Sequence, residues 1–197
     1  MTAQPVATIE LEDGTEVLVR PVLPEDKGRI RDGFERLSPE SRYARFFAPV
    51  KELQQDQLRF LTEVDYVDHF AWVAVKRADP DVGLAVARYV RIEDEPHAAE
   101  AAITVVDAYQ GLGLGTILMQ ALAAAAAEHG IRTFRGHVLA TNRAMLDLLE
   151  LAGARMSRDA GGILRFELDL PGPDDDPPEL PAYRRFRALL RGEPAPG

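Results

Sequence analysis

The stretch Gln110-Gly111-Leu112-Gly113-Leu114-Gly115 places a glycine at every second position and decides how the rest of the chain is interpreted. Residues 101–106, which precede it, are apolar and rich in β-branched side chains, and this pattern predicts a buried strand. Residues 116–129, which follow it, are almost all Ala, Leu, Met and Ile, and they predict a helix that ends at Gly130. The glycines therefore occupy a turn between a strand and a helix.

A turn of this kind can bind an anion. Glycine lets backbone N–H groups converge because no Cβ stands in the way, and the first turn of the following helix adds its own unpaired N–H groups. The helix dipole places partial positive charge at the same end. We therefore expect a pyrophosphate to bind here, in preference to a tight turn without a ligand.

Two common nucleotide-binding motifs do not fit this turn. A P-loop requires Gly-Lys-Ser/Thr, whereas Gly115 is followed directly by Thr116 and no lysine is present. A Rossmann turn requires G-x-G-x-x-G near the start of the chain and an acidic residue about twenty positions later. Here the glycine spacing differs and the predicted helix runs on past Glu128. The turn is therefore expected to belong to a different phosphate-binding fold.

The segment Val105-Val106-Asp107-Ala108-Tyr109-Gln110-Gly111-Leu112-Gly113-Leu114-Gly115 resembles the V-x-x-x-[FYW]-[QR]-x-x-G-x-G motif of the GNAT N-acetyltransferases. The later segment from Asn142 to Gly153 is similar to the helix of that family that lies beside the coenzyme A arm. The likeness covers roughly residues 8–170 by the order of the elements. It implies the GNAT acyl-CoA N-acyltransferase fold, an α/β (α+β) architecture with a mixed, mostly antiparallel sheet flanked by helices.

Within that family the chain is most similar to the bacterial Pat-type protein lysine acetyltransferases. The segments Arg88-Tyr89-Val90-Arg91, Ala99-Glu100-Ala101-Ala102 and Ser38-Pro39-Glu40-Ser41-Arg42-Tyr43 carry this resemblance. It implies transfer of an acetyl group from acetyl-CoA to a lysine side chain of a protein such as an acyl-CoA synthetase. Some Pat enzymes carry a fused regulatory domain, for which we expect no room in 197 residues.

The resemblance also implies which residues bind coenzyme A. Backbone groups of Ile103, Thr104 and Val105 are expected to hydrogen-bond the pantetheine arm, provided that their strand diverges from its neighbour. Gln110 is expected either to bond a phosphate or to close the turn, and Asn142 either to contact the arm or to cap its own helix. The pyrophosphate is expected to accept hydrogen bonds from the backbone N–H groups of Gly111, Leu112, Gly113, Leu114, Gly115 and Thr116.

A lysine amine must lose a proton before it attacks a thioester, because its ordinary pKa is about 10.4. The matching glutamate of Pat-like sequences is taken as the general base, which implies that Glu100 is the catalytic residue, directly or through a water molecule. We expect Glu100 to be buried beside the apolar strand, and the alternative is a solvated side chain after a turn. Many GNAT enzymes have a tyrosine that protonates the leaving thiolate where this chain has Leu149, so no general acid is expected there.

Length and composition favour one enzyme domain over residues 1–170, followed over residues 171–197 by an acidic, Pro-rich linker and a short basic amphipathic segment. The chain has no cysteine, which excludes disulfides and thiolate chemistry. A net charge of −9 argues against nonspecific nucleic-acid binding and is compatible with a basic acceptor. No apolar run is long enough for a signal peptide or a membrane span, so we expect a soluble, cytoplasmic protein that binds no membrane.

Other side chains give weaker signals. The four histidines lack the spacing of a metal site, so no metal is expected. Tyr43, Phe46 and Phe47, together with Arg42 and Arg45, recur at helical spacing, and we expect core packing, with a place in the acceptor groove as the alternative. The C-terminal amphipathic segment is expected to fold back on the domain or to pack against a second copy in a homodimer.

Two further functions stay open at this level. One is a small-molecule amine N-acetyltransferase that acts on a polyamine, an amino acid or an aminoglycoside. The other is a non-catalytic regulator that senses acyl-CoA. The choice depends on loops that bind the acceptor, and no motif in the chain encodes them.

Overall fold

The computed structural model describes residues 6–172 and 175–194, so Asp174 of the acidic linker lies outside the described residues. The strands are β1 (Ala7–Glu10), β2 (Glu16–Pro21), β3 (His69–Lys76), β4 (Asp79–Ile92), β5 (Glu95–Val105), β6 (Thr133–Leu139), β7 (Arg155–Arg158) and β8 (Ile163–Asp169). The helices are α1 (Lys27–Glu35), α2 (Pro39–Phe46), α3 (Gln55–Thr62), α4 (Leu114–Glu128), α5 (Arg143–Leu151) and α6 (Pro181–Arg191), with short 3₁₀ helices η1 (Pro24–Asp26) and η2 (Asp107–Tyr109).

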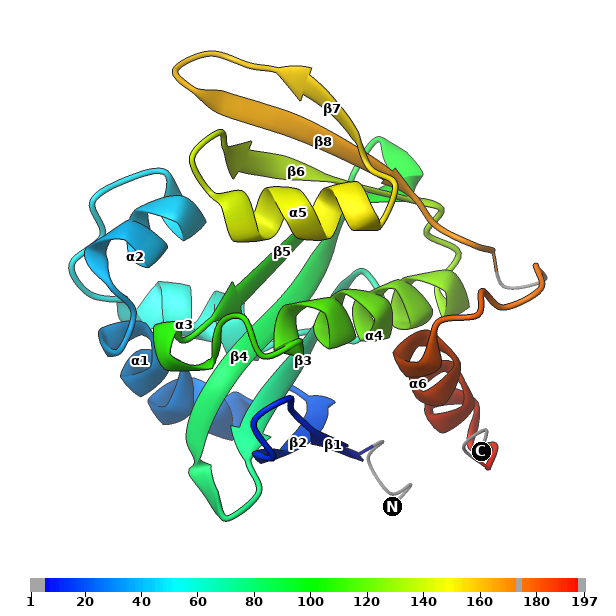
Figure 1. Ribbon diagram of the computed structural model, residues 1–197, viewed down its shortest axis with the longest axis horizontal. Coiled ribbons are helices and arrows are strands. Elements are labelled where there is room, and N and C mark those ends of the chain that lie inside the picture. Colours follow the sequence, from blue (N-terminus) through cyan, green and yellow to red (C-terminus); the bar gives the residue numbers. More distant parts are fainter. Residues whose placement is uncertain (1–5, 173–174, 195–197) are drawn as a thin grey trace.

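Within the described residues the strands form one eight-stranded sheet in the order β1-β2-β3-β4-β5-β6-β8-β7. Every neighbouring pair is antiparallel except β5 and β6, which run parallel. Helices lie on both faces of the sheet, with α1 and α3 on one face and α4 on the other (Figure 1). The predicted fold class, a mixed and mostly antiparallel sheet flanked by helices, is confirmed.

Helix α4 lies close against the sheet because its apolar surface is made largely of alanine. Residues 123–127 are all buried alanines, and a small side chain lets the helix backbone approach the strands. The indole N–H of Trp72 on β3 donates a 3.0 Å hydrogen bond to the carbonyl of Ala121, which ties the sheet directly to the helix backbone. This contact fixes the position of α4 relative to the central strands.

Helix α6 folds back on the same core, which is one of the two arrangements expected for the C-terminal segment. The rings of Phe186 on α6 and Trp72 on β3 meet edge to face, 5.0 Å apart. On the polar side of α6, Arg187 and Arg191 both contact the Glu128 carboxylate at the end of α4. In Figure 1, α6 lies beside the C-terminal end of α4.

Some predicted boundaries and environments are wrong. The tight turn before β4 is formed by Arg77 and Ala78, and no strand was predicted where the edge strands β1 and β7 lie. The predicted core packing of α2 is confirmed for Phe46, whose ring meets the buried Phe34 ring edge to face with the centroids 5.7 Å apart. It is wrong for Tyr43, which is 47% exposed. On the sheet face that carries α1 and α3, α1 packs on β4 and α2 contacts the neighbouring strand β5.

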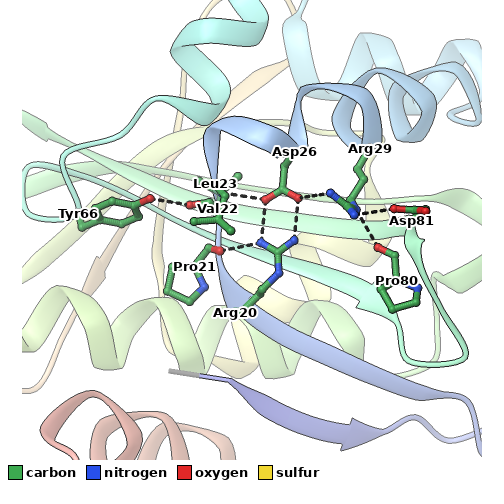
Figure 2. A network of polar contacts seen from close by, with 9 residues as sticks. All are labelled: Arg20, Pro21, Val22, Leu23, Asp26, Arg29, Tyr66, Pro80 and Asp81. Atoms are coloured by element: carbon green, nitrogen blue, oxygen red, sulfur yellow. Dashed lines mark hydrogen bonds and ion pairs between the residues drawn. The ribbon is translucent and has the colours of Figure 1, made fainter. Parts of the chain in front are cut away.

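A buried carboxylate anchors the segment that leads into α1 (Figure 2). Asp26 is fully buried and accepts two hydrogen bonds of 2.7 Å from the Arg20 guanidinium on β2, and a third of 3.1 Å from Arg29. Burial alone would raise the pKa of Asp26, but the bonds from Arg20 and from the Leu23 N–H outweigh it and hold the pKa below its ordinary value. The pair therefore stabilises the fold while Asp26 is ionised.

Replacing Asp26 with Asn is expected to destabilise the protein by about 3 kcal/mol at pH 7, because Arg20 would then be left without its carboxylate. The folded-state pKa of Asp26 is depressed, so the stabilisation is present above the unfolded value of about 4 and is lost as the pH falls through the folded value. Urea unfolding measures this effect: the difference in the free energy of unfolding between the wild type and Asp26→Asn should be smaller at pH 3 than at pH 7.

The matched control is Glu25→Gln, which removes one carboxylate from the neighbouring exposed position. Its effect on the free energy of unfolding should stay within about 0.5 kcal/mol at both pH values. An Asp26→Asn variant as stable as Glu25→Gln at pH 7 would contradict the role given to the buried pair.

Candidate active site

Strands β5 and β6 pair over a short stretch and then diverge. Among the described residues their register is limited to Ala98 with Thr133, Ala99 with Phe134 and Glu100 with Arg135. Beyond this point β6 pairs only with β8, while β5 remains paired with β4 as far as Val105. The backbone of residues 103–105 therefore has a neighbouring strand on one side only. This is the divergence that binding of an extended arm along β5 requires.

The glycine turn lies at the open end of this gap and presents unpaired N–H groups. Gly111 and Gly113 have φ values of +73° and +83°, a conformation that glycine adopts without strain. Within the described chain the N–H groups of residues 111–113 donate no hydrogen bond. Helix α4 begins at Leu114, so the N–H groups of its first turn add to the set. The turn therefore has the donors and the dipole that an anionic group needs.

The two side chains with alternative roles both bond to the protein itself. Gln110 donates from Nε2 to the Val105 carbonyl at 3.0 Å and to the Ser41 hydroxyl at 3.3 Å, so it closes the turn. The Asn142 side chain accepts a 3.2 Å hydrogen bond from the Met145 N–H and caps α5. In this structure each side chain thus positions an element that borders the gap.

Asp107 makes a connection that the sequence did not reveal. Its carboxylate accepts hydrogen bonds from the Ser38 N–H at 3.0 Å, the Ser38 hydroxyl at 2.7 Å and the Ser41 hydroxyl at 2.9 Å. Burial would raise the pKa of Asp107, but these three bonds together hold it below its ordinary value. The carboxylate thus ties the start of α2 to the segment before the glycine turn, across about seventy residues of chain, and only the tertiary fold brings these groups together.

Glu100 lies at the closed end of the gap, on the last residue of β5 that pairs with β6. Its predicted burial is wrong, because the side chain is exposed. Side chains alternate between the two faces along β5, so Ala99 and Ala101 lie in the core beneath α4, whereas Glu100 lies on the opposite face with its side chain exposed. Its cross-strand neighbour Arg135 is already bound by Glu95 and Glu167. The described residues therefore leave the Glu100 carboxylate without an ion-pair partner.

Except for Asn142, which caps α5, the predicted site residues lie on one strand, in the turn that follows it and at the start of α4. Glu100 stands at the closed end of the gap, the backbone of residues 103–105 borders it, and residues 111–116 form its open end. Glu100 and Val105 are separated by roughly 17 Å, since a strand rises by about 3.3 Å per residue. An extended molecule with a phosphorylated end can contact both the turn and the region of Glu100.

Residues 33–154 match the sequence model of the Acetyltransferase (GNAT) family. This match covers more than half of the chain, and the chain belongs to the GNAT acetyltransferase family. The expected resemblance to that family is therefore confirmed.

Individual relatives extend the comparison. The chain is 39% identical over 174 residues to acetyltransferase Pat of Mycolicibacterium smegmatis, covering 87% of this chain and 52% of that protein. It thus spans about half the length of that relative. It is also 38% identical over 150 residues to acetyltransferase PA5475 of Pseudomonas aeruginosa, covering 76% of this chain and 80% of that protein.

Among solved structures, the GNAT domain of the S. lividans PAT protein superposes with a TM-score of 0.76 at 34% identity. The superposition covers 84% of this chain and 97% of that domain. The likeness to Pat-type GNAT domains therefore holds in sequence and in structure.

The described part of the chain contains neither a metal-binding cluster nor a membrane-spanning helix. No cluster of three His, Asp or Glu side chains in this part of the chain could hold a metal ion. None of the described helices has the length and apolar character needed to cross a membrane.

Replacing Gly113 with Ala is expected to weaken coenzyme A binding about tenfold, because an added Cβ strains the backbone at φ +83° and misdirects the N–H donors of the turn. The added Cβ would also lie 3.4 Å from the Glu12 carboxylate. Calorimetric titration with coenzyme A measures the affinity, and thermal unfolding measures the accompanying loss of about 1 kcal/mol of stability.

Gly130→Ala is the matched control, because Gly130 has a φ of +73° at the opposite end of α4 and no atom within 4 Å of an added Cβ. It should lose a similar amount of stability and keep its affinity for coenzyme A. Equal affinity losses in the two variants would show that the turn has no direct part in binding.

Proposed function

We propose that this protein transfers the acetyl group of acetyl-CoA to the side-chain amine of a lysine in a protein, with Glu100 as the general base. An acyl-CoA synthetase is the type of acceptor that we favour. The observation that carries the proposal is the gap between β5 and β6, which has Glu100 at its closed end and unpaired N–H groups at its open end.

In this proposal the turn and the strand bind the cosubstrate. The N–H groups of residues 111–116 hold the pyrophosphate, and the free backbone edge of Ile103, Thr104 and Val105 hydrogen-bonds the pantetheine arm. Gln110 and Asn142 act on these elements through the bonds that close the turn and cap α5. Acetyl-CoA supplies a thioester carbonyl carbon that an amine can attack.

Glu100 acts on the acceptor amine. The carboxylate accepts a proton from the lysine ammonium, directly or through one water molecule, and the neutral amine then forms a bond to the carbonyl carbon. The carbon–sulfur bond breaks, coenzyme A leaves as the thiolate, and the nitrogen loses its second proton to solvent. Its exposure supports this role, because a lysine on another protein must reach it from solvent. No tyrosine is available near the leaving group at Leu149, which is fully buried, and a thiolate can leave without a proton.

A protein acceptor is supported by the relatives and by the surface near the gap. The likeness to acetyltransferase Pat favours a protein lysine, and the net charge of −9 favours a basic acceptor surface. Exposed side chains such as Tyr43 on α2 offer an apolar contact on the sheet face of Glu100. We expect the protein to act in the cytoplasm, where protein lysines and acetyl-CoA meet.

The Glu100→Gln variant is expected to lose about 100-fold or more in kcat and to keep its affinity for acetyl-CoA, since an amide cannot accept the proton. Release of free thiol in the presence of acetyl-CoA and a panel of lysine-bearing proteins measures the turnover. The control Glu93→Gln removes an exposed glutamate from the turn that precedes β5 and should leave turnover within about twofold. Unchanged turnover in Glu100→Gln would remove Glu100 as the base.

The same assay with a panel of small amines tests the alternative acceptors. Turnover with small amines alone would assign the protein to small-molecule acetylation. A lack of turnover with every acceptor, combined with intact acetyl-CoA binding, would favour an acyl-CoA sensor.

A further inference from the structure

A hollow with a volume of about 70 Å³ lies between the first helices and the sheet, on the same sheet face as Glu100. Its lining is mostly apolar and includes Phe34 on α1 and Phe46 on α2. On the side of the sheet it is bordered by Ala102 and Thr104 of β5. Both are half-buried residues of the strand that we assign to the pantetheine arm. The hollow is therefore close to the proposed reaction site.

Two arginines also line this hollow, Arg45 from α2 and Arg88 from β4. Arg88 is only 4% exposed, and its guanidinium donates to the Leu61 carbonyl at 2.9 Å and meets Nε2 of His69 at 3.0 Å. Burial and the charge of Arg88 lower the pKa of His69 to about 4, so this ring is neutral at pH 7 and accepts the bond. Neither contact supplies Arg88 with a negative charge.

Arg45 is half-buried, and its guanidinium makes no hydrogen bond or ion pair with the described residues but lies over an aromatic ring. Its guanidinium carbon lies 5.2 Å from the centroid of the Phe46 ring. No carboxylate of the described chain pairs with Arg45 or with Arg88. Burial and the neighbouring Arg45 charge lower the pKa of Arg88 to about 9, which leaves Arg88 cationic at pH 7. Burial also lowers the pKa of Arg45, and a guanidinium group stays protonated in proteins at this pH. Two like charges therefore face the hollow together.

Two arginines that face one hollow without a carboxylate destabilise the fold unless an anion binds between them. A buried charge without a counter-ion carries a penalty of several kcal/mol, and two like charges add repulsion to it. Elsewhere the same chain pairs its buried charge fully, as Arg20 and Asp26 show in Figure 2. The planar guanidinium group suits bidentate binding of a carboxylate, and the Thr104 hydroxyl at the border of the hollow can donate a further hydrogen bond.

The position of the pair relative to Glu100 identifies the role of this anion. Arg88 on β4 lies directly opposite Ala102 on β5, and Glu100 is the next residue of β5 on the same face. Diagonal neighbours of this kind are about 7–8 Å apart, so one acceptor can place an amine at Glu100 and a negative group at the arginines.

We propose that Arg45 and Arg88 form a carboxylate-binding subsite for the acceptor. The protein would accordingly prefer an amine that is accompanied by a carboxylate. The proposal rests on the acetyltransferase function proposed above. The carboxylate comes either from an acidic residue next to the acceptor lysine of a protein or from a small acceptor with its own carboxylate. The geometry is the same in both cases, so the test includes an arm for each.

The first arm compares Nα-acetyl-L-lysine with its primary amide, and the second compares two end-blocked peptides that carry Glu or Gln beside one lysine. For the wild type we expect kcat/KM to be about tenfold higher for the carboxylate member of at least one pair. Arg45→Gln should reduce this ratio to near one, and Arg45→Lys, which keeps the charge without the planar fork, should give an intermediate ratio. The control Arg31→Gln removes an exposed arginine from α1 and should keep the wild-type ratio.

A preference confined to the peptide pair would identify an acidic protein acceptor, and a preference confined to the lysine pair would identify a small carboxylate acceptor. A wild-type ratio near one in both pairs, or a ratio that Arg45→Gln leaves unchanged, would overturn the subsite. Calorimetric titration of the coenzyme A complex with the same pairs separates the two proposals. Carboxylate-dependent binding that Arg45→Gln removes, without any acetyl transfer, would keep the subsite and overturn the acetyltransferase function. If neither carboxylate-dependent binding nor acetyl transfer is observed, the subsite and the acetyltransferase function are both overturned.

Discussion

The short parallel pairing of β5 with β6 is the constraint on which the rest of the site depends. A parallel pair needs a long crossover connection, and here that connection consists of the glycine turn and α4. The turn must therefore leave β5 at its carboxyl end, where open sheets bind their ligands. Because the pairing stops at Glu100, the strand continues for five residues with a free edge that leads to the turn. One topological feature thus places the catalytic candidate, the backbone edge and the anion cradle along one line.

Helix α4 forms this crossover, and its middle, its C-terminal end and its N-terminal end make different interactions. Its alanines allow close contact with the sheet, and the Trp72 hydrogen bond to Ala121 fixes it in the middle. Its C-terminal end is held through Glu128, which contacts Arg187 and Arg191 of α6. The N-terminal end is left with unpaired N–H groups and needs no capping side chain, because Gly113 makes the bend. Only the backbone N–H groups at the end that faces the gap are thus left without a partner among the described residues.

The sequence predicted the features that depend on local conformation. The glycine turn between a strand and a helix and the alanine-rich helix that follows it depend on residue type, and both were predicted. The strand β7 was missed because all four of its residues are exposed and show no alternation. The exposure of Glu100 was also missed, since it depends on which face of β5 is covered. Tertiary contacts such as Asp107 with Ser38 have no local signal at all.

The distribution of charge separates the structural part of the molecule from the part that we assign to the acceptor. Asp26 is fully buried and receives hydrogen bonds from two arginines, which is what stability alone requires of an interior charge. Arg88 is almost as deeply buried, yet neutral groups satisfy it and its nearest charged neighbour is another cation. The buried ion pair of Arg20 and Asp26 beside α1 has no counterpart at Arg45 and Arg88 beside α2. The unbalanced pair near Glu100 is therefore best explained by a negative charge that arrives with the acceptor.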